Sequence, residues 1–511
     1  MSEKYIIGID SGTQSTRAIL FDTKGNRVAF GSAEHPKLLN PKPGWQEHGK
    51  DDIINGFRGA VSSMFANFRG NKNDIAAVGL SAQRCVFFAL DKNREQLYNP
   101  ISWMDQRWRM NGPAMGKITT GVEDFLYKVF LPYYSKANWF KFNEPELYAK
   151  ADKYLGVGGY LSYKLTGKFF ESISNSFGWP YDIVNWTSYK GDEQIELLGM
   201  RRDQIAEPVV AGTVIGNVTA AAAAEFGLPE GLPVVMGTGD KQSELLGAGA
   251  IKHGQAYITM GTLTGLDIVC NEYKPAPDFA YNTYLGACPK LYNYESAVNK
   301  GFWLISWFRD HLAGGLKAEA EATGLSIEAL LDKAVTSIPP GSEGLVVLPD
   351  WAPVGSRPNS KGLFLGFDER HGRSHMFRAL LEGIMIQLKT GSDTICGKLG
   401  ITINELYIGG GGSKSNTASQ LIADIYNVPV YRVTESENCS LGSAMCGAVG
   451  AGIYTGLPDA AAQMVKNYEE FKPNQDNHDF YKSLSENVIQ KIYPALQNVL
   501  KDLAETRAPQ L

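Results

Sequence analysis

The sequence has little cysteine, and its cysteines are not arranged for metal binding or disulfides. Six cysteines occur in 511 residues, no two form a CxxC pair, and the seven histidines include no HExxH motif. Each cysteine stands among apolar residues or glycines. We therefore expect free, buried thiols in a reduced protein, and no zinc site.

A strong charge of one sign and long apolar runs are lacking as well. Lysine and arginine number 49 against 54 aspartates and glutamates, so the net charge is −5, and no long basic run occurs. No apolar run reaches the roughly 18 residues that a membrane span needs. The first ten residues lead into a strand pattern without an apolar leader. We expect a soluble, cytoplasmic protein with neither nucleic acid nor membrane as a partner.

The length and the pattern of the chain favour at least two α/β domains. Domains usually hold roughly 100 to 200 residues. The runs 5–9, 17–21 and 27–30, joined by polar turns, predict a three-stranded meander. Later, helical stretches alternate with short strands, which is typical of a sheet with helices on its faces. The helical stretches expected in this second half lie at about 299–313, 373–397, 415–427, 440–453 and 478–503.

A weak internal repeat points to two halves of similar plan. Shifting the sequence by 249 residues places Ile9 on Ile258, Gly12-Thr13 on Gly261-Thr262, and Ile19 on Ile268. A strand, a Gly-Thr turn and a second strand thus open each half.

The first loop that could carry chemistry is Asp10-Ser-Gly-Thr-Gln-Ser-Thr-Arg17. Gly12 lets the backbone approach a ligand, the neighbouring residues offer hydroxyl and amide donors, and Arg17 suits a phosphate. Asp10 could hold Mg²⁺, which often bridges carboxylate and phosphate oxygens. The alternative is a plain polar hairpin.

The second loop, Gly237-Thr-Gly-Asp-Lys-Gln-Ser-Glu244, follows an apolar strand and begins a helix. A carboxylate in this place, Asp240, can accept a proton from a substrate hydroxyl. Alternatively, Asp240 only caps the helix. The donor-rich turn Met260-Gly-Thr-Leu-Thr-Gly265 comes shortly after, and it could also be a simple strand connection.

The third loop, Gly409-Gly-Gly-Gly-Ser-Lys-Ser-Asn416, places four glycines between a strand and a helix. Such a loop admits a flat or phosphorylated ligand against bare backbone, although a flexible turn is the alternative. It matches neither the Walker A nor the GxGxxG pattern. The small residues of Cys439–Gly452, at helical spacing, predict close helix packing.

The order of these loops is more specific than any one of them. The succession of Asp10-x-Gly-Thr-x-Ser-x-Arg17, Asp240, Gly261-Thr262 and the glycine loop resembles the actin-like ATPase fold, and within it the FGGY carbohydrate kinase family. That family's further marks resemble segments at 44–47, 103–107, 136–139, 362–366 and 375–383. The resemblance implies two actin-like (ribonuclease H-like) ATPase domains, 1–247 and 248–511, with a nucleotide cleft between them.

The resemblance implies transfer of the γ-phosphoryl group of ATP to a hydroxyl of a small sugar or polyol. Asp240 would be the general base, and Asp10 would help to place Mg²⁺. The expected nucleotide and phosphate contacts are Thr13, Gln14, Arg17, Gly261, Thr262, Gly410, Gly411 and Asn416. Members of the family commonly form dimers or tetramers.

The first half should build the acceptor pocket. The implied contacts are Gln83, Arg84, Trp103, Asp105, Tyr133, Asp240 and Lys241. Glycerol kinases carry Asn-Gln-Arg-Glu where this chain has Ala82-Gln-Arg-Cys85, and xylulose kinases usually show Gln-Met-His there. Lys241 also departs from the family, and it could bind an acidic sugar or pair with Glu244.

A pentulose or pentitol such as xylulose is the first choice of acceptor. The alternatives are glycerol or a tetritol, an autoinducer-type sugar and, more remotely, a catalytically inactive regulatory protein that binds nucleotide and sugar.

Overall fold

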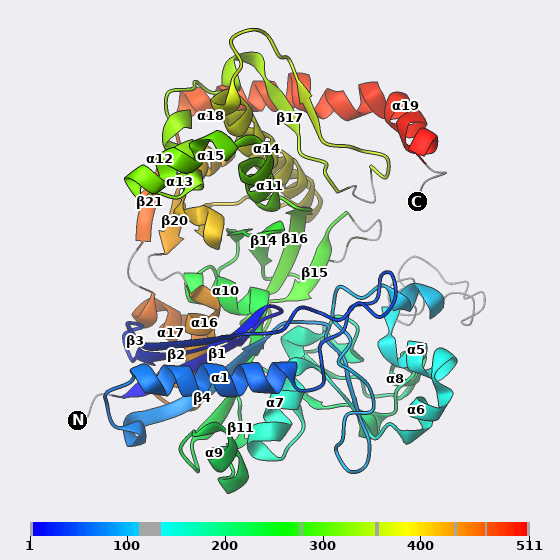
Figure 1. Cartoon of the computed structure of the whole chain (residues 1–511). Coiled ribbons are helices and arrows are strands. Elements are labelled where there is room, and N and C mark those ends of the chain that lie inside the picture. Colours follow the sequence, from blue (N-terminus) through cyan, green and yellow to red (C-terminus); the bar gives the residue numbers. More distant parts are fainter. Residues whose placement is uncertain are drawn as a thin grey trace.

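The computed structural model describes residues 4–111, 134–274, 276, 280–352, 357–433, 437–465 and 468–507. The chain forms two lobes stacked one above the other, with the N-terminal residues in the lower lobe of Figure 1 and the long helices of the second half in the upper lobe. Tyr133, one of the expected acceptor contacts, lies outside the described residues.

The lower lobe is built on a mixed sheet, six-stranded across the described residues, in the order β11-β12-β4-β1-β2-β3. The expected meander forms its edge: β1 pairs antiparallel with β2, and β2 with β3. On the other side, β1 and β12 both run parallel to β4, and β11 pairs antiparallel with β12. The strands are β1 (Tyr5–Ser11), β2 (Ser15–Asp22), β3 (Arg27–Glu34), β4 (Ile75–Ala82), β11 (Val214–Asn217) and β12 (Pro233–Gly239).

The upper lobe holds the second large sheet, with the order β15-β16-β14-β13-β19-β20-β21 in the part of the chain that is described. Its central strand β13 runs antiparallel to β14 and parallel to β19. The strands are β13 (Gln255–Met260), β14 (Thr264–Cys270), β15 (Asn282–Leu285), β16 (Tyr292–Val298), β19 (Glu405–Gly409), β20 (Val430–Val433) and β21 (Tyr468–Phe471).

The two sheets share one plan. Reading from β3 through β2, β1, β4 and β12 to β11 gives two antiparallel, two parallel and one antiparallel pairing. The order from β16 through β14, β13, β19 and β20 to β21 gives the same series. The internal repeat, which laid β1 over β13 and β2 over β14, is therefore confirmed, and β15 is an addition of the second half.

Helices cover the sheet of the upper lobe on its apolar side. The long helix α14 (Arg373–Leu399) buries Leu380, Leu381 and Ile384 in the same core as Leu266 and Ile268 of β14. In the described ranges, no helix combines the length and the apolar composition that a membrane crossing requires. The other helices of this lobe include α11 (Trp303–Leu312), α12 (Lys317–Thr323), α13 (Ile327–Val335), α15 (Asn416–Tyr426), α18 (Gln475–Leu484) and α19 (Gln490–Arg507).

The C-terminal part departs from expectation in one respect. One helix was expected over about 478–503, but a five-residue π-helical turn, Ser485–Ile489, separates α18 from α19. Pro494 lies inside α19. Because proline has no amide hydrogen to donate to the carbonyl four residues earlier, the chain cannot keep regular α-helical bonding there.

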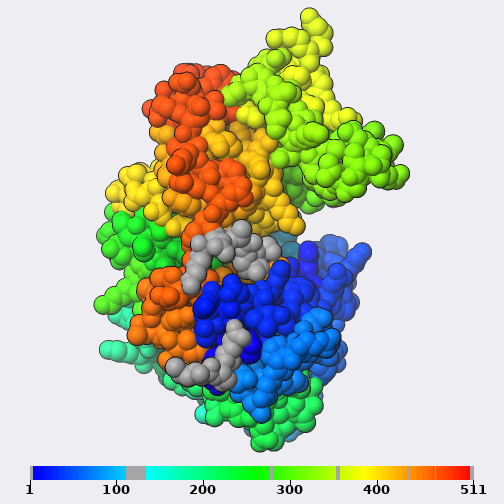
Figure 2. Space-filling view, turned by 90° about the vertical axis from the view of Figure 1, so that its left-hand side faces the viewer, coloured from blue at the N-terminus to red at the C-terminus, as the bar shows by residue number. Residues whose placement is uncertain are grey.

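The helix of small residues, α16 (Asn438–Gly450), belongs to the lower lobe in space although it comes late in the chain. It shares a core with Ile6 and Ile19 of the N-terminal sheet and with Leu246 of α10 (Asp240–Ala248). Figure 2 shows the orange segment that follows residue 438 beside the blue N-terminal residues. The expected packing role of these small residues is confirmed. The division of the chain into domains at residue 248 stays a prediction, because α16 comes from the second half of the chain but packs in the lower lobe.

The remaining elements of the first half surround the lower sheet. They include α1 (Asp52–Asn67), β5 (Phe88–Leu90), α5 (Lys136–Asn143), α6 (Pro145–Lys150), β6 (Lys153–Leu155), α7 (Val157–Thr166), β7 (Phe170–Ser172), α8 (Glu193–Leu197), β10 (Glu207–Val209), α9 (Ala220–Phe226) and the small hairpin β8 (Tyr181–Asp182) and β9 (Thr187–Ser188). In the upper lobe, β17 (Val346–Leu348) pairs with β18 (Leu363–Leu365). The helix α17 (Leu457–Met464) follows α16 and lies with it in the lower lobe.

Candidate active site

The first phosphate-facing turn joins β1 to β2 and brings an acidic side chain and a basic side chain together. Asp10 and Arg17 are direct partners across the hairpin, with 3.6 Å between Arg17 Nη1 and Asp10 Oδ2. Arg17 Nη1 also lies 3.3 Å from Glu437 Oε2, next to the start of α16. Arg17 remains partly exposed, so its guanidinium can still meet a phosphate.

The Asp10 carboxyl lies in an unusual electrostatic environment. Its pKa is raised to about 7, mainly because burial disfavours the charged form; Arg17 and a hydrogen bond with Cys439 partly offset this, whereas Asp240 and Glu244 add to it. A cation near these carboxylates would favour ionised Asp10. Among the described residues, no three His, Cys, Asp or Glu side chains gather closely enough to hold a metal ion by themselves.

The turn is fixed to the N-terminal half by a chain of hydrogen bonds. Thr13 Oγ1 donates to Gln83 Oε1 at 2.9 Å, and Trp103 Nε1 donates to Thr13 Oγ1 at 2.9 Å. Gln83 Nε2 donates to the carbonyl of Gly12 at 3.0 Å. Trp103 is 45% exposed, so it is no core aromatic. Gln14 is exposed beside this network.

Asp240 stands where β12 ends and α10 begins. The N-cap residue of α10 is Gly239, and Asp240 is the first residue of the helix. Asp240 Oδ1 accepts the amide of Lys241, the second residue of the helix, at 2.9 Å and lies 3.4 Å from Arg84 Nε. Its side chain is 31% exposed. A carboxylate at a helix start, beside an arginine and open to solvent, can take a proton from a bound hydroxyl.

Lys241 is held by groups of both lobes. Its Nζ donates to Glu244 Oε2 at 3.2 Å and to Thr259 Oγ1 of β13 at 3.3 Å. Burial alone would lower its pKa, but carboxylates, Glu244 foremost, hold the pKa above its usual value. Of the two roles expected for Lys241, pairing with Glu244 is the one present in the structure.

Asp105 is occupied by its own turn. Its Oδ1 accepts the amide and Nε of Arg107, each at 2.8 Å, and its Oδ2 accepts Arg107 Nη2 at 2.9 Å and the amide of Gln46 at 2.6 Å. The carboxylate is fully buried. Asp105 therefore braces the loop that carries Trp103, and its expected contact with an acceptor stays a prediction.

Arg107 is likewise an internal group and no surface ion pair. Its Nη2 donates to Glu47 Oε1 at 2.6 Å. The guanidinium carbon lies 4.1 Å from the ring centroid of Trp45 and 4.7 Å from that of Trp139. This buried cluster stiffens the wall behind Trp103.

Arg84 reaches from the N-terminal half to the C-terminal half. Its guanidinium carbon lies 4.3 Å from the ring centroid of Tyr284 on β15. Burial disfavours its charge, but Tyr284, Asp240 and Glu295 raise the pKa of Arg84 above its usual value. Neither Tyr284 nor Glu295 was expected at the site; their only signal in the sequence is a tyrosine and a carboxylate in otherwise ordinary strands.

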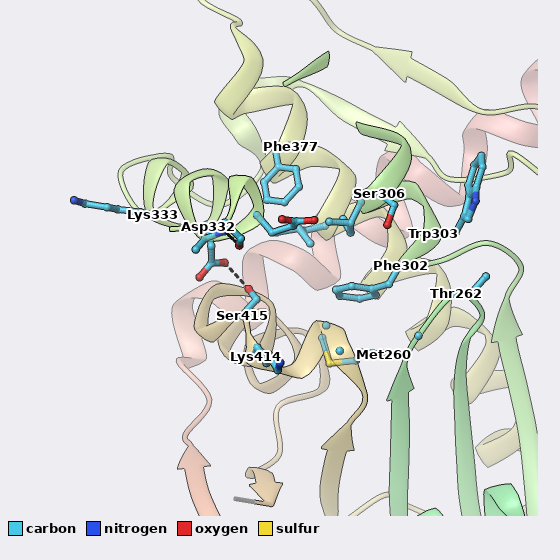
Figure 3. A pocket seen from close by; sticks show the side chains of 18 residues that line it. Met260, Thr262, Phe302, Trp303, Ser306, Asp332, Lys333, Phe377, Lys414 and Ser415 are labelled. Atoms are coloured by element: carbon cyan, nitrogen blue, oxygen red, sulfur yellow. Dashed lines mark hydrogen bonds between the residues drawn. The ribbon is translucent and has the colours of Figure 1, made fainter. Parts of the chain in front are cut away.

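A cavity of about 660 Å³ opens beside the second phosphate-facing turn. Figure 3 shows Phe302 and Phe377 facing into it, while Lys333 points away. Ser415 donates a hydrogen bond to Asp332 at its rim. Its lining includes Gly261, Thr262, Phe302, Ser306, Phe377, Gly411, Gly412 and Lys414.

Two of the expected nucleotide residues flank this cavity and do not line it. Gly410 has φ +84°, and a Cβ there would lie 3.1 Å from the carbonyl oxygen of Met260, so the turn requires glycine. Asn416 begins α15, and its Oδ1 accepts Arg432 Nη2 at 2.8 Å. The notch visible between the lobes in Figure 2 separates the green residues of the second half from the blue N-terminal residues.

A sheet plan repeated in two lobes, with a donor-rich turn at the head of each, is the plan of the actin-like ATPase fold, whose turns serve phosphoryl transfer. The models of the FGGY family of carbohydrate kinases match the chain: the N-terminal domain at residues 5–247 and the C-terminal domain at 256–451. The chain therefore belongs to the FGGY family of carbohydrate kinases. It is a phosphotransferase with an alcohol group as acceptor, and the family implies ATP as the donor.

Individual relatives extend over nearly the whole chain. An uncharacterized sugar kinase of Escherichia coli (strain K12), YgcE, is 31% identical over 98% of this chain and 96% of its own length. A xylulose kinase of Bacillus subtilis (strain 168) is 28% identical over 98% of both chains. The crystal structure of a gluconate kinase from Lactobacillus acidophilus superposes with a TM-score of 0.82 at 24% identity, covering 97% of this chain and 98% of that one, and so shares the fold.

Proposed function

We propose that the protein transfers the γ-phosphoryl group of ATP to a hydroxyl of a small sugar or polyol, with a pentulose or pentitol such as xylulose as the first choice. The observation that carries this is the position of Asp240, partly exposed at the start of α10 with Arg84 3.4 Å away. The likeness to a xylulose kinase at 28% identity supports the choice of acceptor.

ATP would lie between the two turns. The adenosine would fill the cavity that Phe302 and Phe377 face, against the bare backbone of Gly411 and Gly412. Thr13 and Arg17 from one half and Gly261 and Thr262 from the other would meet the phosphates. Gln14, Gly410 and Asn416 would support the site from its margin.

Asp10 would help to hold Mg²⁺. A lone buried carboxylate fits this ion, because Mg²⁺ usually keeps several waters and takes its remaining ligands from phosphate oxygens. When bound, the ion neutralises charge on the phosphates. The raised pKa of Asp10 fits the same role, since a neighbouring cation offsets the repulsion from Asp240 and Glu244.

The reaction needs one proton transfer and one displacement. The Asp240 carboxylate takes the proton of the acceptor hydroxyl while the hydroxyl oxygen forms a bond to the γ-phosphorus. The bond from that phosphorus to the β,γ-bridging oxygen breaks, and ADP is released. Arg17 and the amides of the two turns stabilise the phosphate charge. Arg84, 3.4 Å from Asp240, orients its carboxylate.

The acceptor would lie over Asp240, against Gln83, Arg84 and Trp103. Tyr133 stays a prediction outside the described residues. Asp105 would act through the Trp103 loop, and Lys241 through Glu244. Glycerol, a tetritol or an autoinducer-type sugar remain the alternatives. Glycerol is not the first choice, because Cys85 stands where glycerol kinases carry a carboxylate.

A substrate panel tests this function. ATP consumption is measured with ketopentoses, pentitols, tetritols, glycerol, hexuloses and an autoinducer-type sugar, and the phosphorylated product is identified by mass. We expect one class to raise turnover at least about a hundredfold over ATP alone. If ATP binds but no acceptor raises its turnover, the inactive binding protein is the better reading.

A further inference from the structure

In the C-terminal sheet, strands β14, β15 and β16 carry polar side chains on one face and hydrophobic core residues on the other. In the antiparallel ladder Asp267 of β14 is the direct partner of Glu295 of β16, which in turn faces Asn282 of β15. Residues that are direct partners point to the same side of a sheet. Leu266, Ile268 and Tyr294, their neighbours, point to the other side, and all three are buried in the core of the upper lobe.

This polar face meets the two cations of the N-terminal half. The ring of Tyr284 lies under Arg84, and Glu295 raises the pKa of both Arg84 and Lys241, so its charge acts on both. Asn282 Nδ2 donates to Glu295 Oε2 at 3.4 Å. Arg84 is also the partner of Asp240, so the polar face borders the space in front of the proposed base.

Buried polar atoms around Gly239 lack partners within the described residues. They are Arg84 Nη1, Asn175 Oδ1 and Gln242 Oε1. A Cβ placed on Gly239 would lie 2.7 Å from each of the two oxygens and 2.9 Å from Arg84 Cγ, so the three side chains converge there. Asn175 and Gln242 are almost fully buried. Unpaired buried groups are costly, and a ligand hydroxyl can satisfy both donors and acceptors.

We propose that Glu295 and Tyr284 form the C-terminal wall of the acceptor pocket and determine its specificity, selecting a neutral polyhydroxylated acceptor over a sugar acid. This inference rests on the proposed function and names the wall that the N-terminal half does not supply. Glu295 takes the place of the carboxylate that is absent at Cys85, from the opposite lobe. Tyr284 holds the guanidinium of Arg84 against that wall.

The balance of charge gives the selection its direction. Arg84 and Lys241 are the two cations, and they face four carboxyl groups: Asp240, Glu244, Asp267 and Glu295. Each cation is already engaged, Arg84 with Asp240 and Lys241 with Glu244. An acceptor that brings its own carboxylate would add a further negative charge beside these four carboxyl groups and would be repelled by Glu295, whereas hydroxyl groups can both donate to Glu295 and accept from Arg84.

The test compares neutral and acidic acceptors of one carbon skeleton. For the wild type, kcat/KM is measured with the best neutral acceptor of the panel and with the corresponding aldonate. The variant Glu295→Gln removes the charge and keeps the shape. We expect its KM for the neutral acceptor to rise at least about tenfold, its ratio of neutral to acidic kcat/KM to fall at least about tenfold, and its KM for ATP to stay unchanged.

Controls keep the outcomes separate. Glu321→Gln changes an exposed glutamate of α12 and should alter none of these values. Tyr284→Phe, which keeps the ring, should retain acceptor affinity, and Tyr284→Leu should lose it. Thermal unfolding verifies that each variant is folded; if Glu295→Gln is not, Glu295→Ala, which also removes the charge, takes its place.

Each failure has its own signature. A wild type that phosphorylates no acceptor refutes the proposed function. A wild type that is active but prefers the aldonate, or whose acceptor KM and selectivity are untouched by Glu295→Gln and Tyr284→Leu, refutes this inference alone.

Discussion

Arg84 of the N-terminal half lies over the ring of Tyr284 of the C-terminal half, with 4.3 Å between the guanidinium carbon and the ring centroid. The same arginine is 3.4 Å from Asp240. Cation–π contacts are strongest when water is excluded, and both groups here are largely buried. The proposed base is thereby tied to the opposite lobe, so the relative position of the lobes and the acceptor site depend on each other.

Replacing the proposed base should stop the chemistry without stopping nucleotide binding. Asp240→Asn keeps the size of the side chain but cannot take the proton of a hydroxyl. We expect kcat to fall by about 10²- to 10⁴-fold, with the Kd for ATP within about twofold of the wild type. Acceptor-dependent ADP release and calorimetric ATP binding measure the two quantities.

A matched control for that variant is Asp476→Asn, since Asp476 also stands in the first turn of a helix, α18, but on the surface of the other lobe. Its kcat should equal that of the wild type. Full turnover in Asp240→Asn would show that another group accepts the proton.

Phe302 should matter for ATP and not for the acceptor. It borders the large cavity, and a Cβ on Gly412 would collide with its ring. Loss of a stacked aromatic usually costs about 1–3 kcal/mol per base. We therefore expect Phe302→Ala to raise the KM for ATP at least about fivefold and to leave the acceptor KM unchanged. Phe142→Ala, at an exposed phenylalanine of α5, serves as the control. An acceptor KM that rises in step with that of ATP would place Phe302 elsewhere in the mechanism.

Much of the fold could be predicted from the sequence, because its signals are local. The Gly-Thr turns mark the start of each half, and a helix of small residues announces close packing whatever its partner. The site is less accessible to such reasoning. Arg84 and Tyr284 meet only because strand β15 is added to the edge of the second sheet, and no local pattern reports which lobe its residues will face.

Asp105 shows a second limit to predicting the site from the sequence. The sequence offers a carboxylate next to an exposed tryptophan, which suits a sugar. The chain reverses at once, however, so that the amide and side chain of Arg107 return to Asp105. Whether a carboxylate faces a ligand or its own turn depends on backbone geometry that residue types do not reveal.

The close contact between α10 and α16 should make Gly247 intolerant of a side chain. A Cβ on Gly247 would collide with the carbonyl oxygen of Asn438. Backbone cannot rotate away as a side chain can, so we expect Gly247→Ala to destabilise the protein by about 1–3 kcal/mol or more.

Gly397→Ala is the matched control: this glycine is also helical, in α14, is exposed, and has no atom near its Cβ position among the described residues. It should stabilise by up to about 1 kcal/mol. Urea unfolding measures both, and equal effects would contradict the close packing.

The raised pKa of Asp10 predicts that stability falls as the pH rises. Asp10 has a pKa of about 7 in the folded protein against 3.8 as the usual value. Between these values the folded state holds a proton that the unfolded state has released, so the free energy of unfolding decreases with rising pH and the penalty is complete above about pH 7.

Asp10→Asn removes the penalty. We expect this variant to gain on the order of 1–4 kcal/mol over the wild type at pH 8, and little at pH 4, without Mg²⁺ or nucleotide. With Mg²⁺ and ATP present the difference at pH 8 should shrink, because the wild type binds Mg²⁺–ATP more tightly and so gains more from binding. Chemical unfolding at the two pH values, with and without Mg²⁺–ATP, tests this, and a difference that does not change with pH would assign Asp10 an ordinary pKa.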